Sequence, residues 1–156
     1  MPGRIGVPFS AVYHASKWGL EGYSMGLRAE LASSGVDVVV VEPGPATTAL
    51  FPTMRLPADA DGRAGSYPPV VHETFAAIGG MFEGLFHDPG APTDPGLVVD
   101  RLVELIDMPA GSRPFRSVVG VDFGVRARNA AVEPHDAAVL EAAGLTSFAR
   151  LRVGQS

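Results

Sequence analysis

A tyrosine and the only lysine of this 156-residue chain stand four positions apart, as Tyr13 and Lys17 in the run Tyr-His-Ala-Ser-Lys. Of the 12 basic side chains, the other 11 are arginine, so this lysine departs from the chain's own usage. A lysine ammonium is a compact point charge, whereas a guanidinium is a wide planar fork. On one helix the two residues share a face, and the ammonium lowers the pKa of a neighbouring phenol from about 10 toward neutrality. The pair therefore predicts that Tyr13 works as a general acid or base.

The pair needs a helix to hold it, and the sequence predicts one over residues 11–33, with Gly35 as its C-terminal stop. Small residues recur in this segment at intervals of three and four, which places them on one stripe: Ala15, Gly19, Gly22 and Gly26. Each glycine weakens a helix by up to about 1 kcal/mol. Three in one stripe indicate the close approach of another backbone, either a sheet or a partner helix.

A valine-rich run follows the helix at residues 36–41 and predicts a strand buried on both faces. It ends at the sequence Glu-Pro-Gly-Pro of residues 42–45, where proline removes backbone donors and glycine permits a turn. A helix followed directly by a buried strand is the second half of a β-α-β unit, which implies a parallel sheet. Residues 117–121 predict a second buried strand, so the expected fold class is α/β.

The rest of the chain predicts three more helices. Residues 46–69 are rich in proline and glycine and read as an irregular loop, which in a compact domain is usually functional or mobile. An amphipathic helix follows, with apolar residues at Val71, Phe75, Ile78, Phe82 and Leu85. After a loop over residues 87–95, Asp94 caps a helix that turns Val98, Leu102 and Leu105 inward, and residues 134–143 form a last short helix.

Composition excludes several classes of function. The net charge is −5 and the arginines are scattered, which argues against nucleic acid as a partner. The chain has no cysteine and its histidines lack a ligand spacing, so we expect no metal site. No apolar run is long enough to span a bilayer and no signal peptide is evident, so we expect a cytoplasmic protein without a membrane partner.

Two motifs in this order carry a resemblance to a known family. The run from Tyr13 to Lys17 resembles the Tyr-x-Ala-Ser-Lys signature of the classical short-chain dehydrogenases/reductases. The segment Pro43-Gly44-Pro45-Ala46-Thr47-Thr48 resembles that family's Pro-Gly-x-(Val/Ile)-x-Thr segment, with Ala46 in place of the usual valine or isoleucine. One helix and one strand separate the two motifs, as in the family, and the resemblance extends from residue 1 to about residue 121.

The resemblance implies a nicotinamide cofactor, NAD or NADP, and a role for each matching residue. Tyr13 would protonate the carbonyl oxygen of a ketone during reduction and act as the base during oxidation of a secondary alcohol. Lys17 would lower the tyrosine pKa and hold the ribose hydroxyls of the cofactor. Pro43, Gly44 and Thr48 would flank the nicotinamide, with the Thr48 hydroxyl and nearby backbone amides fixing its carboxamide. This agrees with the rule that ligands lie at the carboxyl ends of strands in open α/β sheets.

The resemblance is incomplete in a definite way. The family places a substrate-orienting serine about a dozen positions before the tyrosine, and Ser10 is too close to fill that role. The glycine-rich phosphate loop is absent as well. We therefore expect a single partial domain over residues 1–156, the C-terminal part of a Rossmann-type doubly wound parallel sheet without its N-terminal βαβ nucleotide-binding half. In the family the region corresponding to residues 46–95 covers the substrate as a loop or lid.

The expected function is that of an NAD(P)-dependent short-chain oxidoreductase acting on a small carbonyl or alcohol substrate of apolar character. A truncated chain of this kind would have little activity alone, and the small-residue stripe of the first helix makes a homo-oligomer the expected assembly. Two alternatives stay open. One is a non-catalytic interaction module that associates with a full-length relative, and the other is a sugar-nucleotide epimerase-type relative, which shares Tyr-x-x-x-Lys but not the Pro-Gly-x-x-x-Thr segment.

Overall fold

Two short parallel strands lie at the centre of the computed structural model, which describes residues 3–152. Strand β1 (Val40–Pro43) pairs with β2 (Arg116–Val119), and Val40 lies opposite Arg116. The predicted α/β class and the parallel pairing of these two strands are therefore confirmed. The doubly wound sheet expected around them stays a prediction.

Both strands differ from the predicted ranges. Strand β1 begins at Val40 and not at Val36, because β2 runs alongside residues 40–43 alone. Before it, the Val38 carbonyl oxygen accepts a hydrogen bond at 2.5 Å from Arg28 Nη1, so this oxygen bonds a side chain. The expected burial on both faces is also wrong for β1. Val40 and Val41 are half-buried, while all four residues of β2 are buried.

Six α-helices and one 3-10 helix occupy the described residues, compared with the four helices that the sequence predicts. Their bounds are α1 (Ala11–Ala32), α2 (Leu50–Thr53), α3 (Ala60–Ala64), α4 (Pro69–His87), α5 (Gly96–Asp107), α6 (Val125–Ala142) and η1 (Thr146–Ala149). The long predicted helices α1, α4 and α5 are confirmed. The additional α2 and α3 are short and lie inside the stretch that was expected to be irregular.

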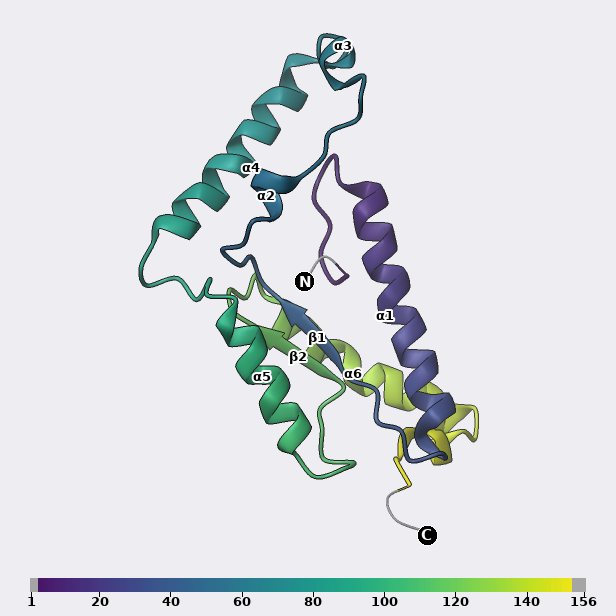
Figure 1. The fold of residues 1–156 in the computed structure, drawn as a ribbon. Coiled ribbons are helices and arrows are strands. Elements are labelled where there is room, and N and C mark those ends of the chain that lie inside the picture. Colours follow the sequence, from purple (N-terminus) through teal and green to yellow (C-terminus); the bar gives the residue numbers. More distant parts are fainter. Residues whose placement is uncertain (1–2, 153–156) are drawn as a thin grey trace.

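The helices cover the two faces of the strand pair unequally. In Figure 1, α5 lies on one side of the strands, α1 on the other, and α6 crosses behind them. Hydrogen bonds agree with this arrangement, because Arg116 reaches Glu21 of α1 while the neighbouring Ser117 accepts from Arg101 of α5. The small apolar core lies where α6 meets the sheet, at Val118 and Val125, with Ile5 packed against them.

Helix α6 begins nine residues before the predicted start. Asp122 Oδ1 accepts a hydrogen bond from the Val125 backbone N–H at 2.6 Å, and Gly124 adopts a left-handed φ of 81°. Pro134, which the sequence reading placed at the start of the helix, lies inside it. A proline removes one helical hydrogen bond and usually marks a boundary, and here the contacts of the preceding residues with the sheet override that signal.

Helices α3 and α4 form an arm that extends away from the sheet (Figure 1), and neither buries a side chain. A contact between the rings of Phe9 and Phe75, 5.7 Å apart, joins the arm to the loop before α1. Helix α5 packs by Leu105 and Val98, but Leu102 is 44% exposed, so its predicted inward orientation is wrong. The apolar period correctly predicted that α5 is a helix, but its buried face is narrower than the three predicted residues imply.

Candidate functional site

The tyrosine and the lysine lie in the first two turns of α1, as their spacing predicts. The Lys17 Nζ atom is 5.6 Å from the centre of the Tyr13 ring, a distance at which an ammonium is attracted to an aromatic face. Tyr13 is 51% exposed and Lys17 is half-buried. The phenol is thus accessible to another molecule while the cation beside it is partly shielded. The catalytic roles of both residues stay predictions.

Residues 3–7, which we call the entry segment, pack along the helix beside this pair. A Cβ on Gly3 would lie 2.8 Å from the Lys17 carbonyl oxygen, so only glycine fits there. The Val7 backbone N–H donates to His14 Nε2 at 3.2 Å. Trp18 Nε1 donates to the Ile5 carbonyl oxygen at 3.4 Å. The segment therefore contacts α1 at three positions next to Tyr13 and Lys17.

At the carboxyl end of β1, Gly44 packs tightly against the chain that follows β2. Its backbone N–H donates to the Val119 carbonyl oxygen at 2.8 Å. A Cβ on this residue would collide with the Val121 carbonyl oxygen. This glycine is therefore required by the packing of two backbone segments. Pro43, the last residue of β1, is exposed at the same end of the strand.

The two threonines after the turn differ in their surroundings. Thr47 is fastened to Thr93, because its backbone N–H donates to the Thr93 carbonyl oxygen at 2.8 Å and the two hydroxyl oxygens are 3.3 Å apart. Thr48 is exposed, and its hydroxyl accepts from the Leu50 N–H at 3.4 Å. Both threonines are exposed, and they differ in that the Thr47 hydroxyl is bonded to a distant side chain while the Thr48 hydroxyl is bonded only to its own turn. The anchoring role of Thr47 was missed at the level of sequence.

The two halves of the predicted site face the same part of the molecule. Helix α1 and strand β1 run in opposite directions, so the amino end of α1 and the carboxyl end of β1 both face the side on which the arm lies (Figure 1). Antiparallel placement of this kind lets a helix start and a strand end contribute to one site. Tyr13 and Lys17 come from the helix, and Pro43, Gly44 and Thr48 come from the strand end and its turn.

A buried polar cluster lies under the site, and the sequence analysis did not anticipate it. Asn129 of α6 accepts from Arg4 Nε at 2.7 Å and donates to Glu42 Oε2 at 2.5 Å. Arg116 Nε donates to Glu21 Oε2 at 3.0 Å, and both side chains are nearly inaccessible. The signal that could have revealed the cluster is charge within apolar elements, namely Glu42 at the end of a valine strand and Arg116 at the start of another.

Burial shifts the ionisation of two members of this cluster. Loss of water raises the pKa of the Glu42 carboxyl above its usual value, and the hydrogen bond from Asn129 opposes that rise. Burial also lowers the pKa of the Arg4 guanidinium, and the nearby positive charge of Arg116 acts in the same direction. The cluster therefore holds charges in an environment that disfavours them.

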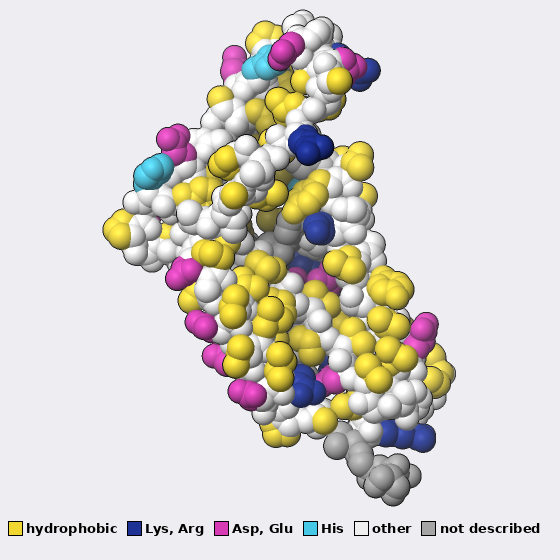
Figure 2. Space-filling model, in the orientation of Figure 1, with side chains coloured by type: hydrophobic (Ala, Val, Ile, Leu, Met, Phe, Trp, Pro, Cys, Tyr) yellow, Lys and Arg dark blue, Asp and Glu magenta, His cyan; other side chains and the backbone are white. Residues whose placement is uncertain are grey.

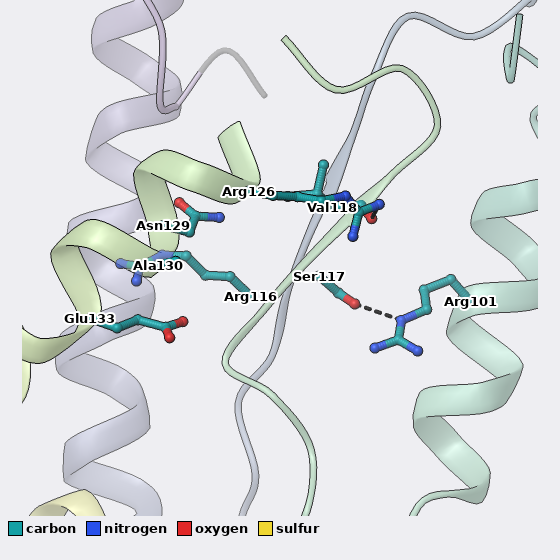
Figure 3. Close-up of a pocket in the computed structure, with 8 residues that line it drawn as sticks. All are labelled: Arg101, Arg116, Ser117, Val118, Arg126, Asn129, Ala130 and Glu133. Carbon is teal, nitrogen blue, oxygen red and sulfur yellow. Dashed lines mark hydrogen bonds between the residues drawn. The ribbon is translucent and has the colours of Figure 1, made fainter. Parts of the chain in front are cut away.

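An open hollow of about 280 Å³ lies along the outer side of β2, away from the predicted site residues. Its lining consists of Arg101, Arg116, Ser117, Val118, Arg126, Asn129, Ala130 and Glu133 (Figure 3). Arg101 Nε donates to Ser117 Oγ at 2.6 Å and Arg126 Nη2 donates to the Val118 carbonyl oxygen at 2.6 Å. The two guanidinium groups thus bond to β2 from both flanking helices, one at a side-chain hydroxyl and one at a backbone carbonyl.

Two classes of site are not found within the part of the chain that the structure describes. No three or more histidine, aspartate or glutamate side chains are placed there to hold a metal ion together. None of the described helices is both long enough and apolar enough to cross a membrane.

Comparisons with known proteins point to one family. Residues 1–58 match the family model described as short chain dehydrogenase. This stretch contains all of Tyr13, Lys17, Pro43, Gly44 and Thr48, so both motifs lie inside the matched region.

Curated relatives carry similar names. The chain is 29% identical over 122 residues to Oxidoreductase BOA17 of Botryotinia fuckeliana, which covers 77% of this chain and 40% of the relative. It is 48% identical over 46 residues to the Uncharacterized oxidoreductase YbbO of Escherichia coli, covering 30% of this chain and 17% of the relative. It is 39% identical over 62 residues to the Uncharacterized oxidoreductase YusZ of Bacillus subtilis, covering 36% of this chain and 22% of the relative. The chain thus spans two fifths or less of the length of these relatives.

Proposed function

We propose that the protein, whose residues 1–58 match the short chain dehydrogenase family model and which is similar to curated oxidoreductases, is an NAD(P)-dependent oxidoreductase. In this proposal it reduces a ketone or oxidises a secondary alcohol, within the doubly wound Rossmann-type sheet of that family. The single observation that carries the proposal is the approach of the Lys17 ammonium to the half-exposed ring of Tyr13.

The side chains at the site fit a nicotinamide cofactor in part. Lys17 offers an ammonium for ribose hydroxyls, and Thr48 offers an exposed hydroxyl for the carboxamide. The backbone N–H groups of Gly44 and Thr47 are already bonded to carbonyl oxygens. We therefore assign the binding of the nicotinamide carboxamide to the Thr48 hydroxyl and not to these backbone amides.

The chemistry of the chain's own residues then follows. The Tyr13 hydroxyl donates its proton to the carbonyl oxygen of the substrate during reduction and accepts it back during oxidation. The Lys17 ammonium binds the cofactor and places positive charge beside the phenol. A bound nicotinamide would supply or accept the hydride. The exposed position of Tyr13 in the first turn of α1 supports this role, since a proton donor must reach the substrate.

An apolar substrate and a covering role for residues 46–95 belong to the same proposal. The contact between Phe9 and Phe75 supports them, because it joins the arm to the loop that leads into the tyrosine helix. The arm is largely solvent-exposed, and an apolar ligand would add contacts that the arm lacks.

The proposal is tested by replacing Tyr13 with Phe in the protein as its own cells make it. Turnover of a series of ketones of increasing apolar area is followed with NADH and with NADPH. Tyr13→Phe should abolish turnover and leave cofactor binding intact, whereas Tyr23→Phe is the matched control, since Tyr23 is an exposed tyrosine of the same helix. Retained turnover in Tyr13→Phe would overturn the assignment.

A second candidate function is supported by the exposed apolar surface. Among residues 3–152, no heavy atom outside the helix itself and the chain neighbours lies within 4 Å of a Cβ built on Gly19, Gly22 or Gly26. The glycines of the small-residue stripe therefore face open space in the described part of the chain. Hydrophobic side chains are also exposed over α5, and Figure 2 shows many of them on one face of the molecule. In this alternative the chain is an interaction module that associates with a full-length relative or with a second copy.

The same turnover experiment, together with a measurement of the protein's mass in solution, separates the two candidates. An interaction module shows no turnover with either cofactor, and its mass in solution exceeds that of one chain. An oxidoreductase shows turnover that depends on Tyr13, whether or not it forms the homo-oligomer expected from the stripe.

A further inference from the structure

The start of α1 lacks the local support that most helices have. Ser10 precedes the first helical residue, yet its side chain makes no capping hydrogen bond. The first backbone N–H groups of a helix have no partner within the helix, and an uncapped first turn frays readily. Tyr13 lies in that first turn. Its placement four residues before Lys17 on one face therefore depends on contacts from outside the helix.

The entry segment supplies these contacts. It reaches the helix at Lys17 through Gly3, at His14 through Val7, and at Trp18 through Ile5. All three helix positions lie within five residues of Tyr13. When the segment is in place, the first two turns of α1 are covered on one side by the backbone of residues 3–7.

On its other side, the entry segment is joined to the sheet and to α6 through one side-chain amide. Arg4 is 5% exposed, and its Nε donates to the Asn129 side-chain oxygen. The Asn129 side-chain nitrogen donates in turn to Glu42 at the end of β1. Asn129 is 6% exposed and comes from α6, more than a hundred residues away along the chain. One side chain thus joins the entry segment, the strand that precedes the Pro-Gly turn, and the last long helix.

The chemistry of asparagine suits this position. An amide accepts with its oxygen and donates with its nitrogen at once, which a carboxylate or an apolar side chain cannot do. Arg4 Nη2 and Glu42 Oε1 are buried and have no hydrogen-bond partner among the described residues. Removal of the amide would leave further atoms of two buried charged groups unpaired, which is costly.

We propose that Asn129 is a positioning residue for the Tyr13–Lys17 pair, acting through Arg4 and the entry segment, with Glu42 fixing the orientation of its amide. The catalytic role of the Tyr13–Lys17 pair rests on the proposed function, whereas the hydrogen bonds that join Asn129 to the entry segment do not depend on it. The carboxyl-terminal helix α6 thereby controls the first turn of the helix that carries the phenol.

Asn129→Leu tests the linkage in the full protein, because leucine has a similar volume and neither hydrogen bond. We expect backbone amides of residues 5–14 to exchange with deuterium about ten- to a hundred-fold faster, the range that corresponds to the loss of hydrogen bonds to charged groups. Amides of β2 should keep their protection. Glu133→Gln, an exposed position one turn further along α6, is the matched control and should change neither region.

Trp18 provides a second and independent signal. It is the only tryptophan of the chain, and it lies against the guanidinium groups of Arg4 and Arg128, 5.9 and 5.1 Å from the ring centre. Selective ¹⁹F labelling of this indole should report a shifted resonance in Asn129→Leu and an unchanged one in Glu133→Gln. Arg4→Leu should shift the resonance as well, and by a different amount, because it also removes a guanidinium from the indole ring. The double variant should match Arg4→Leu alone, because without Arg4 the linkage to Asn129 is already broken.

Three results would overturn the inference. They are unchanged exchange in residues 5–14 of Asn129→Leu, additive shifts in the double variant, or a loss of protection that extends to β2. The last result would mean that Asn129 holds the whole fold and not the entry segment. A wild-type protein without turnover would refute the proposed function alone, since exchange and resonance shifts do not depend on catalysis.

Discussion

Around the two strands, buried charged and polar side chains join distant segments, whereas the arm of α3 and α4 buries no side chain. Beside the sheet, Glu21, Glu42, Arg116 and Asn129 are each less than a tenth exposed. On α4, Val70, Phe75 and Met81 are each at least half exposed. Both regions contain a long helix, α1 in one and α4 in the other, so helix formation alone does not separate them.

This difference in burial shows where the molecule relies on hydrogen bonds between buried groups to fix the positions of its elements. Hydrogen bonds between buried groups fix relative positions, because an unpaired buried charge is far more costly than a displaced methyl group. Such bonds join α1 to β2 and α6 to β1. The described hydrogen bonds of the arm lie mainly within α3 and α4, so fewer long-range contacts fix its position. A site formed by both regions would have a rigid base, here called the fixed floor, made of the strands and α1, and a more adaptable cover made of α3 and α4.

The largest effect is expected from breaking the buried ion pair of Glu21 and Arg116. Glu21→Gln removes the negative charge that lies 3.0 Å from Arg116 Nε. Loss of one partner of a buried pair typically costs about 3–5 kcal/mol, and we expect the lower end because the amide oxygen can still accept. The free energy of unfolding, measured with urea, should fall by about 3 kcal/mol.

Glu30→Gln is the control for this change, since Glu30 is an exposed glutamate of the same helix. It should alter stability by about 0.5 kcal/mol or less. Equal effects of the two substitutions would mean that the ion pair does not distinguish the sheet region from the surface.

Two glycine substitutions, one beside the strands and one in the arm, should change the stability of the protein in opposite directions. In Gly44→Ala the new methyl group would meet the Val121 backbone, and overpacking of this kind costs about 1–3 kcal/mol. In Gly79→Ala, within α4, the new methyl group meets no described atom within 4 Å and should stabilise the helix by up to about 1 kcal/mol. Thermal unfolding of the two variants should therefore shift in opposite directions from the wild type.

The outcome that contradicts this prediction is a loss of stability in Gly79→Ala. It would show that a backbone or side chain packs against the middle of α4 in solution, and that the arm is not open as described.

Sequence reasoning succeeded where a pattern is local. The helical spacing of Tyr13 and Lys17 was enough to place them on one face, and the apolar period of residues 71–85 was enough to predict α4. Short elements of the long loop, α2 and α3, were missed because one turn of helix has no period to detect. The start of α6 was misplaced because Pro134 is a strong local signal for a boundary.

The buried polar cluster could not be predicted for a different reason. Arg4 and Asn129 are 125 residues apart, and neither has a pattern that points to the other. A single sequence gives no measure of pairing between distant positions. The valine run of residues 36–41 likewise indicates a strand, but which of its residues pair depends on where β2 ends.

The smallest expected effect concerns the pH dependence of stability through Glu42, which is 3% exposed. Burial raises its pKa in the folded protein above the ordinary value of 4.5, with Glu21 adding to the rise and Arg4 and the Asn129 bond opposing it. The folded state therefore binds this proton more tightly than the unfolded state. Its contribution to stability is complete below pH 4.5 and is lost as the pH rises through the folded-state pKa.

Glu42→Gln isolates this contribution, because the amide oxygen can still accept from Asn129 and carries no charge to desolvate. We expect the free energy of unfolding of the variant, relative to the wild type, to increase as the pH rises from 4.5 toward neutrality. Glu73→Gln, at an exposed position of α4, should show no such trend. Urea unfolding at a series of pH values measures both differences. If the two substitutions give the same pH profile, the carboxyl of Glu42 is hydrated in solution, and the fixed floor inferred for the site is more open than its buried contacts indicate.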